Sequence, residues 1–187
     1  MISKVNQKSG FTLIESLLAI GVLIVGVLSA FILVVRSLSN IPLIQSRLIA
    51  ANLAQEGIEL IRQKRDTNYI QGLDWINGFN DQCICMDNSQ LADECYFVID
   101  ANSRTLKQYD NDDYLKFNKE LGIYSYDTGE ILPYFFQRKI EICFPQQNNN
   151  KEMRIKETVY WKVKQNNYSL IVEDHLFDYY GLLSSSH

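Results

Sequence analysis

The sequence predicts an α+β protein in which a long N-terminal helix packs on an antiparallel β-sheet. Two observations carry this prediction. The first is a helix-length apolar segment near the N-terminus, and the second is a period-two alternation of apolar residues over residues 139–176. About 120 of the 187 residues follow the first long helix, which is enough for one small globular domain.

Residues 11–35 are predicted to form a membrane-spanning helix, because Glu15 is the only charged side chain among these 25 residues. At 1.5 Å per residue such a helix is about 37 Å long, and a bilayer core is about 30 Å thick. Lys4 and Lys8 precede the segment without an acidic residue. We therefore expect a cytoplasmic N-terminus, with the chain beyond Arg36 outside. The alternative is a secretory signal peptide, whose apolar region is typically only about 7–15 residues long.

Glu15 is an unusual residue in this setting. A carboxylate at the centre of a membrane helix costs about 2.5–3.5 kcal/mol, and less near the interface, so an intramembrane ionisable residue is a functional candidate. A position in the headgroup zone, or simple protonation, would also account for Glu15. The residue by itself does not decide between these readings.

The sequence KSGFTLIE, residues 8–15, resembles the processing site of type IV prepilins and related pseudopilins. That site has a short basic leader, a Gly before the cleaved bond, then Phe, a Glu at the fifth mature position and an apolar run. Gly10, Phe11 and Glu15 match these positions. The resemblance implies cleavage after Gly10, N-methylation of Phe11 and use of Glu15 in filament assembly. Glycine suits the cleaved bond because it has no side chain to obstruct a protease.

The same resemblance implies the partners and the location of the chain. The partners would be a prepilin peptidase, other pilin subunits that bind through the N-terminal helix, the inner-membrane assembly platform, and membrane lipid before assembly. The chain would be a single-pass membrane protein first and part of a cell-surface filament afterwards. No cofactor is implied.

Residues 36–66 are expected to continue the helix, with Pro42 kinking it or breaking one hydrogen bond. Residues 51–66 resemble the second half of the long helix in PilV-like minor pilins. The residues expected on the apolar face follow helical spacing: Ile41, Ile44, Leu48, Ala51, Leu53, Ile58 and Ile61.

Residues 67–187 are predicted to form the globular β domain. Short strands are expected at residues 95–100 and 105–109 within a turn-rich region. Three longer strands follow, with a turn at residues 165–168, and Glu157 interrupts an otherwise apolar strand face. Such alternation indicates an antiparallel meander with one covered face, and the helix is the simplest cover. Lollipop-shaped pilins have this arrangement. The alternating apolar residues are Ile140, Ile142, Phe144, Met153, Ile155, Val159, Trp161, Val163, Tyr168, Leu170, Val172 and Leu176.

Four cysteines, Cys83, Cys85, Cys95 and Cys143, all follow the apolar segment. An even number of cysteines in an oxidising exterior domain indicates disulfides. Cys83 and Cys85 are too close in sequence to bond each other easily, so one is expected to bridge Cys95 and the other Cys143. Zinc is the alternative, but C-x-C lacks the usual ligand spacing.

The sequence gives little support for a calcium site. Asp110, Asp112 and Asp113 do not fit a calcium loop of the EF-hand type, which would need Gly and Glu at fixed later positions. We therefore expect a solvated acidic loop and no metal site.

Nucleic-acid binding is also not expected. A basic strand face could contact DNA, although residues 67–187 carry eleven basic and eighteen acidic side chains. We therefore do not expect DNA to be a partner. The residues of that face are Arg154, Lys156, Tyr160, Lys162, Lys164 and Tyr168.

No catalytic constellation accompanies the two histidines, and His175 is expected to be a packing residue, so an enzyme is not predicted. The sequence instead predicts a structural subunit, a minor pilin of a type IV pilus or pseudopilus. It would comprise a leader (1–10), a membrane or filament-core helix (11–35), its continuation (36–66) and an extracytoplasmic domain (67–187). The alternatives are a single-span anchor with an extracellular binding or sensing domain, and a pseudopilin of a secretion or DNA-uptake machine.

Overall fold

The computed structural model describes residues 12–79, 82–85, 93–145 and 151–179. The chain divides into two compact units, Met1–Pro42 and Leu43–His187. Helix α1 (Leu13–Ile70) belongs to both units, and Pro42, the predicted site of a kink, lies inside the helix at their boundary. Gly10, Phe11 and the predicted leader lie outside the described residues.

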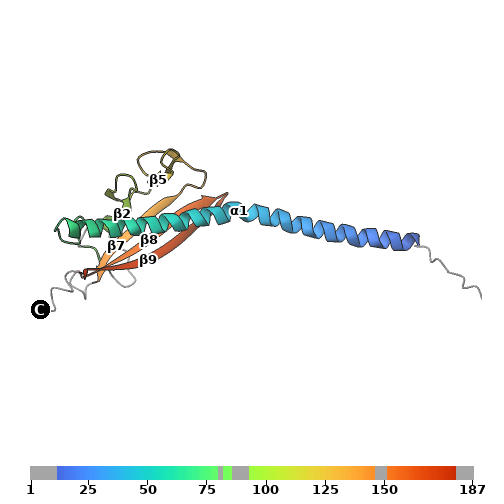
Figure 1. Ribbon diagram of the computed structural model, residues 1–187, viewed down its shortest axis with the longest axis horizontal. Coiled ribbons are helices and arrows are strands. Elements are labelled where there is room, and N and C mark those ends of the chain that lie inside the picture. Colours follow the sequence, from blue (N-terminus) through green and yellow to red (C-terminus); the bar gives the residue numbers. More distant parts are fainter. Residues whose placement is uncertain (1–11, 80–81, 86–92, 146–150, 180–187) are drawn as a thin grey trace, which may run out of the picture. The chain divides into compact units, whose positions relative to one another are not determined.

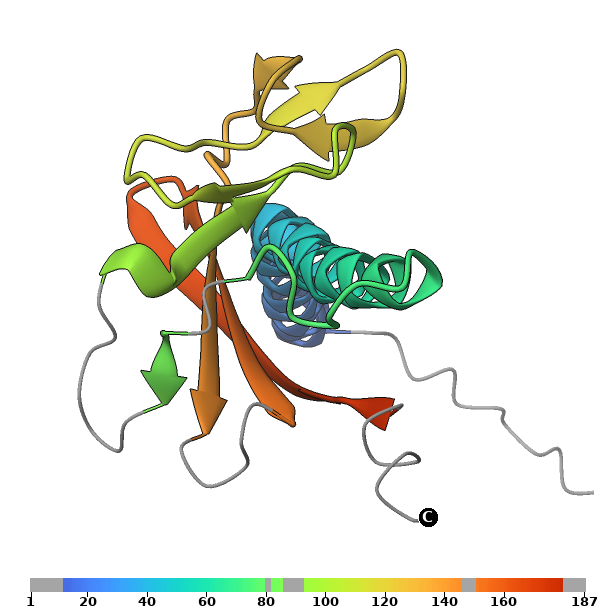
Figure 2. The same ribbon diagram turned by 90° about the vertical axis from the view of Figure 1, so that its left-hand side faces the viewer.

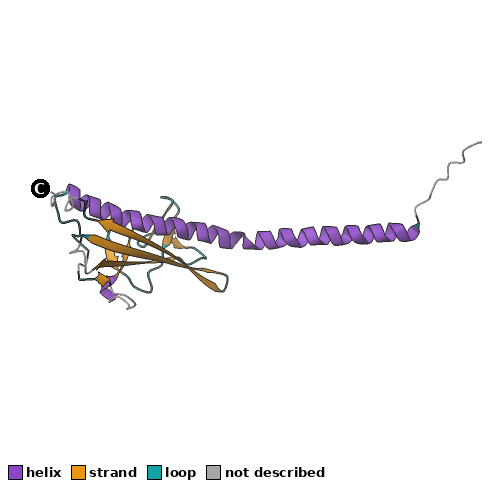
Figure 3. Cartoon of the chain, turned by 90° about the horizontal axis from the view of Figure 1, so that it is seen from below, coloured by secondary structure: helices purple, strands orange, loops and turns teal. Residues whose placement is uncertain are grey.

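Within the second unit, α1 lies along one face of a β-sheet, which confirms the predicted α+β fold (Figures 1 and 3). The strands of this sheet follow the order β3-β2-β7-β8-β9, and every neighbouring pair in this order is antiparallel. Strand β1 pairs with β7 in parallel. The strand bounds are β1 Ile84–Cys85, β2 Tyr96–Ile99, β3 Leu106–Gln108, β7 Gln137–Pro145, β8 Glu152–Val163 and β9 Asn166–Phe177.

The helix face that meets the sheet differs in part from the predicted one. Ile41, Ile44 and Leu48 are exposed, whereas Ser46 and Ala50 are buried. Ile44 and Leu53 are nine residues apart, and at about 100° per residue they point to opposite sides of the helix. The remaining buried residues of α1 are Leu53, Ala54, Gly57, Ile58, Ile61, Arg65 and Asn68.

The turn between β8 and β9 also differs from the prediction. It contains only Lys164 and Gln165, because Val163 already pairs with Asn166. Lys164 has φ 57°, the left-handed conformation that two-residue hairpins favour. The predicted turn residues 166–168 are therefore part of β9, and Lys164 lies in the turn instead of on the strand face.

A second, three-stranded sheet was not predicted; Figure 2 shows it in yellow, separate from the main sheet. Its strands are β4 (Lys116–Asn118), β5 (Ile123–Ser125) and β6 (Glu130–Ile131), in the order β5-β4-β6. Gly129 precedes β6 with φ 126°, and a Cβ there would lie 2.7 Å from the Phe117 backbone. This close backbone approach requires glycine.

Candidate functional site

Glu15 lies in the first turn of α1, and its backbone N–H donates to Thr12 O at 3.1 Å. A carboxylate in the first turn interacts favourably with the helix dipole, typically by about 0.3–1 kcal/mol. The structure thus gives Glu15 a local stabilising role in addition to the assembly role implied by the resemblance.

Apart from Glu15, apolar side chains predominate on all sides of α1 from Leu13 to Val35. All of its residues from Leu13 to Ile41 are exposed, and the segment is long and apolar enough to cross a membrane. A helix that is apolar all round needs an apolar environment, from lipid or from other helices. Ile44 (65% exposed) and Leu48 (63%) extend this exposed apolar character into the second unit.

Arg138 of β7 connects the helix to the sheet in the second unit. Its guanidinium is fully buried and donates to Leu53 O at 3.1 Å and to Glu56 Oε2 at 3.2 Å, both on α1. It also donates to Ile99 O of β2. A buried arginine requires such partners, because an unpaired charge in the core is strongly unfavourable.

Glu157 of β8 is fully buried beside Arg138, and Glu157 Oε1 lies 3.8 Å from Arg138 Nε. That distance is too long for a hydrogen bond, and among the described residues neither carboxyl oxygen has a hydrogen-bond partner. Burial raises the pKa of Glu157 to about 8; Arg138 lowers it in part, and nearby Glu56 raises it further. We conclude that the carboxyl group is largely neutral near pH 7.

Asp100, which follows β2, holds the two sheets together. Asp100 Oδ2 accepts hydrogen bonds from Ser125 Oγ at 2.8 Å and from Tyr126 N at 2.7 Å. Oδ1 accepts from the backbone N–H groups of Asn102 and Ser103. Burial raises the pKa of Asp100, but these hydrogen bonds outweigh it and lower the pKa to about 2.

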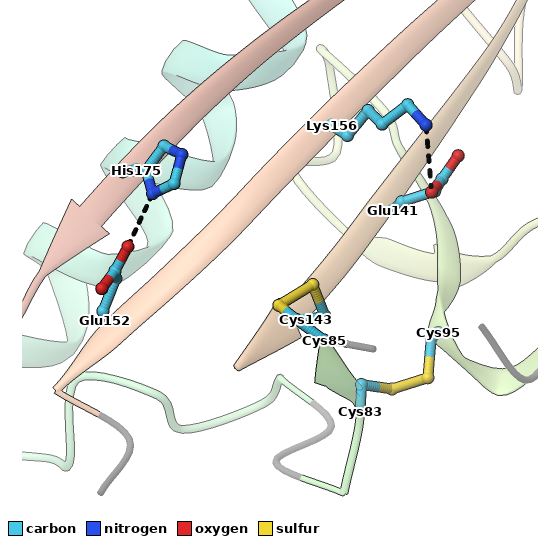
Figure 4. Close-up of a disulfide and its surroundings, with 8 residues drawn as sticks. All are labelled: Cys83, Cys85, Cys95, Glu141, Cys143, Glu152, Lys156 and His175. Carbon is cyan, nitrogen blue, oxygen red and sulfur yellow. Dashed lines mark hydrogen bonds and ion pairs between the residues drawn. A yellow bond between two sulfur atoms is a disulfide. The ribbon is translucent and has the colours of Figure 1, made fainter. Parts of the chain in front are cut away.

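The structure contains two disulfides, Cys83–Cys95 and Cys85–Cys143, in an arrangement that the sequence favoured (Figure 4). All four cysteines are paired, so none remains as a thiolate for the zinc alternative. Within the described residues, no group of three or more His, Cys, Asp or Glu side chains could hold a metal ion.

The prediction that His175 is a packing residue is wrong. His175 is exposed on the outer face of β9, where Nδ1 lies 2.6 Å from Glu152 Oε1 (Figure 4). Its neighbour Leu176 is the buried residue of this pair, as strand alternation requires.

The predicted basic face is also smaller than expected. Lys156 lies 3.8 Å from Glu141 (Figure 4), which neutralises part of its charge. Tyr168 lies on the opposite side of the sheet from Tyr160, where its ring stacks on Trp161 at 5.8 Å. This face therefore carries fewer unpaired cations and one tyrosine fewer than the sequence indicated.

Three structurally important residues were not identified from the sequence: Arg138, Asp100 and Gly57. Glu157 lies directly against Gly57, where a Cβ would be 2.1 Å from Glu157 Oε2. A charged residue in an apolar strand face and a glycine within a helix were the sequence signals of this contact. Comparison with known proteins found no match: no family model, no curated protein and no solved structure resembles the chain significantly.

Proposed function

We propose that this chain is a minor subunit of a type IV pilus or pseudopilus. The main evidence is the motif formed by Gly10, Phe11 and Glu15. An apolar helical segment follows it, and the described residues of this segment are exposed up to Ile41. The α+β architecture adds support, because residues 43–70 of α1 pack on an antiparallel sheet, as in pilins.

In this proposal, prepilin peptidase cleaves after Gly10 and methylates Phe11, while the membrane holds the helix with its N-terminus in the cytoplasm. The assembly platform then moves the helix from lipid into the filament, where neighbouring helices cover its apolar surface. The exposed Ile44 and Leu48 provide further apolar surface for such neighbours.

Glu15 would determine how far one subunit is shifted along the next. Cleavage would give Phe11 a free amine four residues before Glu15, which is about 6 Å at the axial rise of an α-helix. A neighbouring subunit displaced along the axis would offer its amine directly to this carboxylate. In a low-dielectric filament core, pairing compensates two charges that are each unfavourable alone. Apolar helices slide past one another with little preference, so this pair would fix the register.

Intact mass and N-terminal sequencing of protein from sheared surface filaments test the proposal. We expect a chain that begins at Phe11 and carries one added methyl group. Gly10→Val is the control, because its branched side chain should crowd the cleaved bond and leave the leader attached. A chain that stays in the membrane with its leader, and is absent from filaments, would contradict the proposal and favour a single-span anchor.

A further inference from the structure

An open cavity of about 470 Å³ lies where β8 turns into β9, and the filament role proposed above does not use it. Its volume falls within the roughly 300–1,000 Å³ that is usual for small-molecule sites. Aromatic rings, amides and one ammonium group line it together: Tyr114, Phe135, Tyr160, Gln137, Asn167 and Lys162.

The aromatic part of the wall is exposed. The rings of Tyr114 and Phe135 pack edge to face, with centroids 6.2 Å apart and an interplanar angle of 75°. Phe135 is 49% exposed and Tyr160 is 37% exposed. Exposed rings beside a cavity offer apolar area that a flat ligand would remove from water.

Phe135 is held in a strained backbone conformation. Its φ is 48°, in the left-handed region that bulky residues rarely adopt. Two hydrogen bonds hold this segment, from Phe135 N to Leu132 O at 3.1 Å and from Lys162 N to Tyr134 O at 2.8 Å. Such strain persists only where the surroundings enforce it, and it concentrates at ligand sites.

The polar part of the wall has free hydrogen-bonding capacity. Lys162 and Asn167 are opposite each other on β8 and β9, and within the described part of the chain their side chains have no hydrogen bond or ion pair. Gln137 donates through Nε2 to Asn111 O at 2.5 Å, so a ligand would meet its amide oxygen as an acceptor. Donors and an acceptor thus line the cavity beside the rings.

We propose that this cavity binds a neutral hexopyranose unit of a glycan. A pyranose has an apolar C–H face, which would lie on the exposed ring of Phe135, and hydroxyl groups, which would bond to Asn167, Gln137 and Lys162. Single-stranded nucleic acid would also stack on the rings, but it requires a basic groove. Here Lys162 is the one cation among the lining residues, and the acidic residues Asp112 and Asp113 directly precede Tyr114.

Saturation-transfer NMR on the purified full-length chain tests this inference. The chain is held in a phosphocholine detergent, because maltoside or glucoside detergents would compete for the site. The probes are lactose, cellobiose and N,N′-diacetylchitobiose, with oligothymidylate as the nucleic-acid probe. We expect saturation transfer to the ring protons of at least one disaccharide, and none to oligothymidylate.

Phe135→Gly is the informative variant, because glycine removes the ring and also relieves the positive φ, so the fold should be retained. It should weaken sugar binding by at least about tenfold. Phe177→Ala is the matched control: Phe177 is an exposed ring (38%) near the other end of β9 and should leave binding unchanged. No transfer to any sugar, wild-type sugar binding by Phe135→Gly, or binding of oligothymidylate alone would each overturn the proposal.

Discussion

The carboxyl group of Glu157 packs directly against Gly57, and a Cβ at position 57 would lie 2.1 Å from Glu157 Oε2. Glycine within a helix costs about 1 kcal/mol relative to alanine. At this position it allows the helix to approach a buried carboxyl group on β8. The helix and the sheet therefore pack so closely here that position 57 has no space for a side chain.

Gly57→Ala should lower the free energy of unfolding by about 1–3 kcal/mol, although alanine is the better helix former. The added methyl group would displace a carboxyl group that is enclosed in the core. Urea unfolding of a soluble fragment comprising residues 43–187 would measure the loss. Gln55→Ala, at an exposed helix position, is the control and should change the free energy little.

The double variant Gly57→Ala with Glu157→Ala tests the cause. If the two side chains compete for the same space, the double variant should be more stable than the sum of the two single losses predicts. Strictly additive losses would contradict the packing explanation.

Glu157→Gln should change how stability depends on pH. Between the ordinary pKa near 4.5 and the folded pKa of about 8, the unfolded chain releases a proton that the folded chain retains. Glu157 therefore makes the free energy of unfolding fall as pH rises across this window, by a few kcal/mol in total. Glutamine has no proton to lose, so the variant should lose this slope and be the more stable form near pH 8. Parallel pH profiles for both proteins would contradict a neutral buried carboxyl group.

Asp100→Asn should have the opposite pH signature. The pKa of Asp100 falls from 3.8 to about 2 on folding, so its contribution is present above pH 3.8 and is lost as pH falls through 2. Asparagine would place an amide N–H opposite groups that are themselves hydrogen-bond donors. The free energy of unfolding at neutral pH should therefore fall by about 2–3 kcal/mol. The difference in the free energy of unfolding between variant and wild type should shrink as the pH falls. A constant difference down to pH 2 would contradict a lowered pKa of Asp100.

Removal of the two disulfides should have unequal effects. Cys83–Cys95 spans 12 residues and Cys85–Cys143 spans 58. Chain entropy gives about 3 kcal/mol for the shorter loop and about 4 kcal/mol for the longer one. Paired Cys→Ser variants, compared by thermal unfolding, should show the larger loss for Cys85 and Cys143. Alkylation of all four cysteines in the native protein would show that the disulfides do not form.

Glu15→Ala should insert in the membrane and be processed normally, yet fail to enter filaments. The cleavage site is unchanged, whereas the proposed partner of the neighbouring amine is lost. Immunoblots of membrane and sheared-filament fractions would measure this, with Ser16→Ala as a neighbouring control. Incorporation of Glu15→Ala at the wild-type level would leave Glu15 as a tolerated interfacial residue.

The sequence predicted the elements whose patterns are long. The alternation in β7, β8 and β9 extends over 9–12 residues per strand, and the apolar segment of α1 is longer still. Glu157 was visible as a break in its strand face. The cysteine spacing also limited the possible disulfides, because Cys83 and Cys85 are too close in sequence to bond each other easily and therefore need separate partners.

The remaining features depend on contacts between distant residues. Strands β4, β5 and β6 have two or three residues each, too few for a periodic pattern. The role of Arg138 requires that Leu53 and Ile99 lie beside it, which no local signal encodes. The helix face was partly wrong because apolar residues occur on two sides of α1, and only the position of the sheet decides which side is buried.

Strand β1 has two residues, too few to remain at a sheet edge through backbone hydrogen bonds alone. Both disulfides attach this segment, and Cys83 O accepts from Phe144 N of β7 at 2.7 Å. Without oxidation, this end of β7 would be an open edge, able to pair with a strand of another chain. We therefore expect the cysteines also to protect against aggregation: a chain kept in a reducing compartment should self-associate through β7 before it loses its core.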